Sequence, residues 1–217
     1  RQDLQRGASS GDMFYGNKNL WFKPFGSWAN QNDQNGTSGY RANSYGTAFG
    51  SDADVSYATH LGVAFSYANS QVDGNSSTAR QTAHVNSYQL AFFGRHSLDE
   101  ATELSFQVDI GRHRNAGKRS VVFLNQIASS EYDSWSGHIG AGLGHTLQLS
   151  GGSTFTPSLR ADYTAIRDER YSETGSDANL DVDGNRTEAF VLSINGKLGH
   201  ALTDSTRLIA NLGVGYD

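Results

Sequence analysis

Two short runs and seven histidines are the residues whose types and spacing could support binding or catalysis. The run Gly140-Ala-Gly142-Leu-Gly144 has the spacing of a loose nucleotide loop, but no strand-to-helix context surrounds it. The run Asp181-Val-Asp183-Gly184-Asn185 is spaced like part of a calcium loop, but it lacks the acidic residue that closes such a loop. The histidines have no metal-ligand spacing, and there is no Gly-x-Ser-x-Gly motif. These motifs predict no cofactor and no metal site.

The composition favours strands over helices. The 217 residues include 25 Gly, 2 Pro, 11 Phe, 10 Tyr and 3 Trp, and the mean hydropathy is -0.54. The longest apolar runs, Leu90 to Phe93 and Val121 to Leu124, are far too short to cross a bilayer as a helix, whereas a barrel strand needs only about 9–11 residues. A formal net charge of -5 argues against nucleic acid as a partner, and the lack of Cys suits an oxidising compartment.

A strict period of two runs through most of the chain and predicts β-strands. In the clearest segment, Leu61, Val63, Phe65 and Tyr67 share one face, while Gly and Ser or Ala occupy the other. Similar faces recur in segments near residues 20–29, 45–49, 88–92, 104–110, 135–143, 155–163, 190–194 and 208–216. The alternation predicts about nine strands.

The expected connections alternate in length. Short polar turns fall near residues 51–57, 95–101, 149–153 and 199–205, and longer loops near 30–39, 73–80, 115–130 and 170–186. Outer-membrane barrels have short periplasmic turns on one rim and longer extracellular loops on the other. The sequence therefore predicts an all-β fold, a transmembrane antiparallel up-and-down β-barrel in one domain, with a soluble β-sandwich or lipocalin-like module as the alternative.

The two faces of the predicted strands differ in a way that suits a barrel in lipid. One face is apolar, and the opposite face is small or polar, as the lumen of a narrow barrel requires. The predicted lumen-lining polar residues are Gln107, Asp109, His138, Arg160, Asp162 and Asn211. The predicted residues of an outward aromatic girdle are Tyr67, Tyr88, Trp135 and Tyr163.

Several motifs in a fixed order resemble a known family. The segments are Gly11-Asp12, Leu20-Trp21-Phe22-Lys23-Pro24-Phe25-Gly26-Ser27-Trp28, Gly39-Tyr40, Tyr45-Gly46, Gly50-Ser51-Asp52, Gly62-Val63-Ala64-Phe65-Ser66-Tyr67, and Pro157-Ser158-Leu159 with Tyr163. Together they resemble the C-terminal β-barrel translocator domain of autotransporters, the type V secretion system of Gram-negative bacteria. The resemblance covers nearly the whole chain.

The resemblance implies a twelve-stranded barrel in the bacterial outer membrane that exports a passenger to the cell surface and anchors it there. Residues 1–18 would then hold the end of a lumenal helix or linker, around Asp3 to Arg6. Residues 19–217 would form the barrel domain, with its C-terminal strands missing, because an unclosed edge in lipid leaves backbone groups unsatisfied. The implied partners are the passenger and lumenal helix, the barrel-assembly machinery, and outer-membrane lipid and lipopolysaccharide. The protein is expected to be a monomer without cofactor.

Other functions remain open from the sequence. A small porin or solute channel would have a constriction with opposed charges and no helix plug, and a soluble module would purify without detergent. Some autotransporters cleave their passenger inside the barrel with acidic residues, and Asp109, Asp162 and Glu188 are the candidates, although alternation places Glu188 outside and Arg160 beside the other two. No family cleavage motif matches, so no enzymatic role is expected. Arg112-His113-Arg114 is expected to end the fifth strand, where its charges either meet lipopolysaccharide phosphates or are simply solvated.

Overall fold

The computed structural model describes residues 13–15, 18–33, 38–76, 80–203 and 206–216. These residues form one large antiparallel sheet and a separate two-stranded sheet, with no helix other than one 3-10 turn in this part of the chain. The elements are β1 (Met13–Tyr15), β2 (Lys18–Gln31), β3 (Tyr40–Asp54), β4 (Thr59–Gly74), β5 (Gln81–Ser97), β6 (Thr102–Val121), η1 (Val122–Leu124), β7 (Gln126–His145), β8 (Leu147–Gln148), β9 (Ser153–Asp168), β10 (Tyr171–Ser172), β11 (Asp181–Val182), β12 (Asn185–Ala201) and β13 (Arg207–Tyr216).

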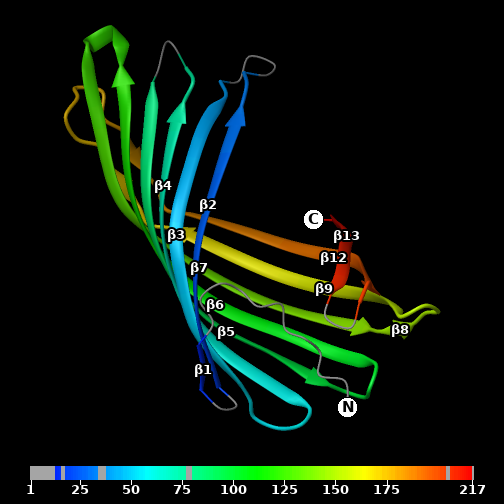
Figure 1. Ribbon diagram of the computed structural model, residues 1–217. Helices are drawn as coiled ribbons and strands as arrows, with labels where there is room; N and C mark the ends of the chain where they lie inside the picture. The colour runs from blue at the N-terminus through cyan, green and yellow to red at the C-terminus, as the bar shows by residue number, and fades with distance from the viewer. Residues whose placement is uncertain (1–12, 16–17, 34–37, 77–79, 204–205, 217) are drawn as a thin grey trace.

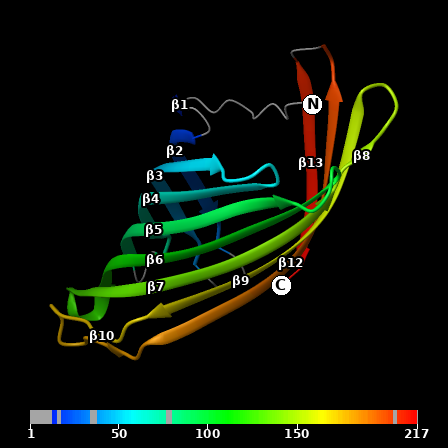
Figure 2. The same ribbon diagram turned by 90° about the horizontal axis from the view of Figure 1, so that it is seen from below.

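The sheet has an up-and-down topology. Its strands are hydrogen-bonded in the order β1-β2-β3-β4-β5-β6-β7-β9-β12-β13, so each long strand pairs with its neighbours along the chain, while β8 pairs with β9 and the separate β10 pairs with β11. Figures 1 and 2 show the sheet curled into a trough, with β2 and β13 at opposite margins. The nine long strands and the all-β barrel-type architecture confirm the sequence prediction, whereas the total of twelve strands in a complete barrel stays a prediction.

The apolar side chains of the described residues do not form a core. Only Val121 and Ala128 are buried hydrophobic residues, and the large apolar side chains of the outer face stand exposed, including Ile110 at 57 % and Ile139 at 56 %. A water-soluble sandwich would bury this face against a second layer. A continuous apolar surface around a curled single sheet instead fits a hydrocarbon environment.

The predicted asymmetry of the two rims is present, with one correction. Connections 55–58, 98–101 and 149–152 are short turns on one rim, and the long connection 169–184 lies on the other. The predicted loop 115–130, however, is wrong, because β6 continues to Val121 and β7 begins at Gln126. Arg112-His113-Arg114 therefore lies within β6 and does not end it. No continuous apolar face runs through these extensions, so the apolar alternation that marks a membrane strand is lost there.

Candidate functional site

Six polar side chains from four neighbouring strands form a connected network on the inner face of the sheet. Asp109 of β6 accepts hydrogen bonds from Gln89 Nε2 at 2.6 Å and from Gln107 Nε2 at 2.8 Å. His138 of β7 lies between two carboxylates, with Nδ1 2.7 Å from Asp109 Oδ2 and Nε2 2.8 Å from Asp162 Oδ1. The alternation of each strand places all of these side chains opposite the apolar face.

The network continues on β9. Arg160 donates from Nε to both oxygens of Asp162, at 3.0 and 2.8 Å, and from Nη2 to Oδ1 at 2.7 Å. Glycines make room for these side chains, since a Cβ added at Gly140 would lie 2.2 Å from Asp162 Oδ1. The sheet therefore brings five of the six predicted lumen-lining residues together.

The chemistry of the network suits a hydrophilic wall. Both ring nitrogens of His138 face carboxylate oxygens, an arrangement that the imidazolium satisfies because both of its nitrogens donate. Two carboxylates then balance one imidazolium and one guanidinium, so the cluster carries little net charge. Asp109 is only 4 % exposed and its oxygens already accept three hydrogen bonds. The cluster is thus a closed structure in which polar groups satisfy each other.

The remaining predicted residues lie elsewhere. Asn211 is on the inner side of β13 and pairs in register with Lys197 of β12. Lys197 pairs in turn with Thr156 of β9, which is six residues away from Asp162 along that strand. It does not join the network. Glu188, weighed as a cleavage residue, lies on the outer face as alternation indicated and pairs with Arg186 at 2.5 Å.

The predicted girdle residues fall in two different cross-strand rows on the outer face. Tyr67, Tyr88 and Trp135 fall in one cross-strand row. Tyr67 pairs in register with Tyr88, and Arg112 lies between Tyr88 and Trp135 as the register partner of both. The rings of Tyr67 and Tyr88 lie 5.3 Å apart. Tyr163 instead pairs with Ile139, four residues along β7 from Trp135. Three of the four thus share one cross-strand row, and their role in an interfacial girdle stays a prediction.

The inner wall also carries an aromatic group that sequence reasoning missed. Trp21 and Phe93 lie on the inner face with ring centroids 6.5 Å apart. They cover Gly50 and Gly62, where an added Cβ would meet each ring at 2.4 Å. Trp21 also donates from Nε1 to Asp52 at 3.0 Å. The glycines of this region therefore accommodate inward rings and do not leave empty space. The only signal in the sequence was that Trp21 and Phe22, like Phe92 and Phe93, must face opposite sides.

A second cluster fastens the long connection between β9 and β12 to the extended ends of β6 and β7. Arg119 donates from Nε to Glu173 at 3.1 Å and from Nη2 to the carbonyl of Ala178 at 3.0 Å. Ser129 and Thr174 exchange two backbone hydrogen bonds, at 2.8 and 2.9 Å. The hydrogen bond from Arg119 holds the pKa of Glu173 below its usual range. The connection is therefore an ordered structure beside the β6–β7 tip (Figure 1).

Metal sites and helical membrane spans are both absent from the part of the chain that the structure describes. No group of three or more His, Cys, Asp or Glu residues there is arranged to hold a metal ion. Among these residues there is also no helix of the length and apolarity that a bilayer crossing by a helix requires.

The curled antiparallel sheet, its apolar outer face and its polar inner wall define the outer-membrane β-barrel class. Comparison with protein families matches residues 20–217 to the autotransporter beta-domain. The chain belongs to this family, and it is an outer-membrane translocator domain located in the bacterial outer membrane.

Individual relatives agree with this assignment. The chain is 23 % identical over 197 residues to outer membrane protein B of Rickettsia rickettsii and 25 % identical over 207 residues to outer membrane protein A of Rickettsia conorii. These alignments cover 87 % and 88 % of the chain but only 12 % and 10 % of the relatives, so the chain spans about a tenth of their length.

Two solved structures share the fold. The translocator domain of autotransporter NalP from Neisseria meningitidis superposes with a TM-score of 0.77 at 19 % identity, covering 96 % of this chain and 69 % of that one. The β domain of the Bordetella autotransporter BrkA gives a TM-score of 0.56 at 14 % identity, covering 92 % and 81 %.

Proposed function

We propose that this domain exports a passenger polypeptide linked to it in the same protein and then anchors that passenger at the cell surface. The observation that carries the proposal is the combination of an apolar outer face with a hydrogen-bonded polar network on the inner face of one curled sheet, in a member of the autotransporter family. A strand that crosses the bilayer needs a partner at every backbone group, so we expect the sheet to be closed into a barrel around the exported segment in the membrane.

The inner wall supports conduction of a polypeptide. Its polar groups are mutually hydrogen-bonded, as in the Asp109–His138–Asp162–Arg160 network, and so offer few uncompensated charges to a passing chain. A closed network of this kind guides a chain without holding it tightly. We assign it a structural role and no catalytic one, and we propose that any enzymatic activity belongs to the passenger.

The wider set of partners follows from residence in the outer membrane. We propose that the barrel-assembly machinery inserts the domain, that it works as a monomer, and that its outer face contacts outer-membrane lipid, including lipopolysaccharide at the rim of the long connections. The support is family membership together with the apolar outer face, whose exposed side chains include Ile110 and Ile139.

Surface display tests the proposed function. In cells that produce the full-length protein, external protease should remove the passenger while the barrel strands stay protected, and a version without the barrel domain should display no passenger. A passenger that stays in the periplasm while the barrel is correctly inserted would contradict the proposal. A porin would instead give an open conductance in a planar bilayer and display nothing.

A further inference from the structure

A row of three arginines and one tryptophan crosses four strands on the outer face. It borders the apolar band on the side of the long connections. Arg112 of β6 pairs in register with Trp135 of β7, Trp135 with Arg167 of β9, and Arg167 with Arg186 of β12. Neighbouring strands lie about 4.8 Å apart, so the three guanidinium groups start from backbone positions within roughly 15 Å of one another. The Arg112 guanidinium lies over the Trp135 ring at 5.7 Å from its centroid.

The row marks a boundary between two different surfaces. Toward the rim of the short turns, the same face presents Ile110, Ile139 and Phe190, each more than half exposed. At the far edge of that band β6 and β7 present Thr102 and His145 in place of arginines. The arginine row therefore belongs only to the rim of the long connections, which is the extracellular rim of an outer-membrane barrel.

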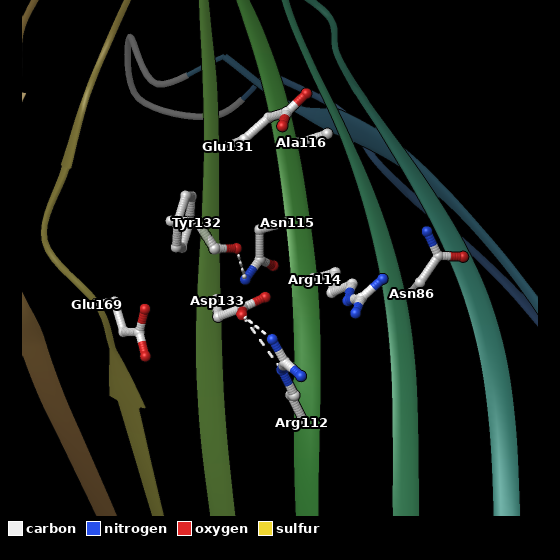
Figure 3. Close-up of a pocket in the computed structure, with 9 residues that line it drawn as sticks. All are labelled: Asn86, Arg112, Arg114, Asn115, Ala116, Glu131, Tyr132, Asp133 and Glu169. Atoms are coloured by element: carbon white, nitrogen blue, oxygen red, sulfur yellow. Dashed lines mark hydrogen bonds and ion pairs between the residues drawn. The ribbon is translucent and has the colours of Figure 1, made fainter.

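A polar pocket of about 490 Å³ opens just above the row. Figure 3 shows Arg112 and Asp133 joined across it, with Arg114 and Asn86 on one side and Glu169 on the other. Asp133 accepts a hydrogen bond from Arg112 Nε at 3.2 Å. This mixture of donors and acceptors beside aromatic rings suits the hydroxyl groups of a sugar, which both donate and accept hydrogen bonds.

Charge pairing leaves part of the row available. Asp133 accepts a hydrogen bond from Arg112, and Glu188 forms an ion pair with Arg186. These contacts position the two arginines, and each guanidinium keeps further N–H groups that do not bond to the carboxylate. Among the residues that the structure describes, no carboxylate forms an ion pair with Arg114 or with the exposed Arg167. Arginine binds phosphate through two parallel hydrogen bonds, which makes it the side chain best suited to a phosphate at this height.

We propose that this surface, consisting of the Arg112–Trp135–Arg167–Arg186 row and the pocket above it, binds one phosphorylated glycolipid of the outer leaflet. The acyl chains lie on the apolar band, the phosphate lies against Arg112 and Arg167, and the sugar occupies the pocket beside Asn86. The site rests on the proposed function only in that both require insertion in the outer membrane, since the surface faces away from the lumen.

The test uses the full-length protein purified in detergent, freed of lipid and titrated with bis-phosphorylated lipid A while bound lipid is counted by native mass spectrometry. The double variant Arg112→Gln/Arg167→Gln should bind at least about tenfold more weakly than the unaltered protein. The control Arg41→Gln removes an exposed charge on β3, away from the pocket, and should leave affinity within about twofold. A heat-modifiable gel shift verifies that each variant is folded.

Three results would overturn the site. They are equal binding by the double variant, equal binding of dephosphorylated lipid A by the unaltered protein, and displacement of lipid A by phosphatidylglycerol at matched concentration, which would indicate a surface for any anionic lipid. Passenger display by the double variant, measured on cells, separates the two proposals. Display should be unchanged, and a failure of the unaltered protein to display its passenger while it still binds lipid A would count against the translocator function alone.

Discussion

Removing the charge of Glu173 should release the connection between β9 and β12 from the β6–β7 tip. Glu173 is only 8 % exposed, accepts two hydrogen bonds from Arg119 and receives a third from the backbone N–H of Leu180 at 2.9 Å. Glu173→Gln keeps the shape of the side chain but removes the negative charge that strengthens its hydrogen bonds with Arg119. Because Arg119 is 24 % exposed and can turn to water, we expect a loss of about 2 kcal/mol, which increases the undocked population roughly 30-fold.

Hydrogen exchange on the folded protein measures this release. The amides of Ser129 and Thr174, which bond each other across the docked connection, should exchange roughly 30-fold faster in Glu173→Gln. Amides of the central strands, such as that of Val108, should keep their protection. Unchanged exchange at Thr174, or an equal loss of protection throughout the sheet, would refute the reasoning.

Acid should reproduce the effect in the unaltered protein. The pKa of Glu173 is lowered in the folded state by its hydrogen bond with Arg119, so the stabilisation is fully present above the carboxyl's unfolded pKa of about 4.3 and is lost as pH falls through the lower folded value. The protection factor of the Thr174 amide, which corrects for the pH dependence of intrinsic exchange, should therefore fall only below about pH 4. Glu173→Gln should show no such step, and a step of equal size in both proteins would assign it to another group.

Three further substitutions, with Val122→Lys as a control, test the two faces of the sheet. Gly50→Ala would place a Cβ 2.4 Å from the Trp21 ring, and we expect about 1–3 kcal/mol of destabilisation in urea unfolding from lipid; an unchanged midpoint would contradict the packing. Ile139→Lys should cost about 2–4 kcal/mol in the same assay, whereas Val122→Lys at the tip should cost nothing measurable, and equal effects would argue against an apolar band in lipid. Asp109→Leu leaves buried donors without their acceptor and should cost about 3 kcal/mol; a loss below about 0.5 kcal/mol would show that the network is not closed.

Period-two alternation was a sufficient signal wherever one face of a strand meets lipid. In β4 and β6 the apolar residues Val63 and Val108 alternate with small or polar ones, because lipid and lumen impose opposite requirements on successive side chains. The same rule predicted Asp109, His138 and Asp162 for one surface, and in the structure these three side chains are joined by hydrogen bonds. It conveyed nothing about which of them touch, since this depends on the register between strands.

Sequence reasoning failed where those opposite requirements disappear. Residues 115–121 and 126–130 continue as strands, yet no continuous apolar face runs through them, and they were expected to be a loop. The docking of Glu173 on Arg119 joins residues 54 positions apart and leaves no local pattern. The contact between Phe93 and Trp21 was equally hidden, because it joins residues far apart in the sequence.

Cysteine labelling on intact cells tests most directly whether the domain crosses the outer membrane in the orientation described. These 217 residues contain no Cys, so a single Val122→Cys at the β6–β7 tip or Leu98→Cys in the opposite short turn adds one reactive thiol to this domain, at an exposed position in each case. A maleimide that cannot cross membranes should label Val122→Cys on intact cells and Leu98→Cys only after the outer membrane is permeabilised. Equal labelling of both positions on intact cells, or labelling of Leu98→Cys alone, would contradict a translocator barrel in this orientation.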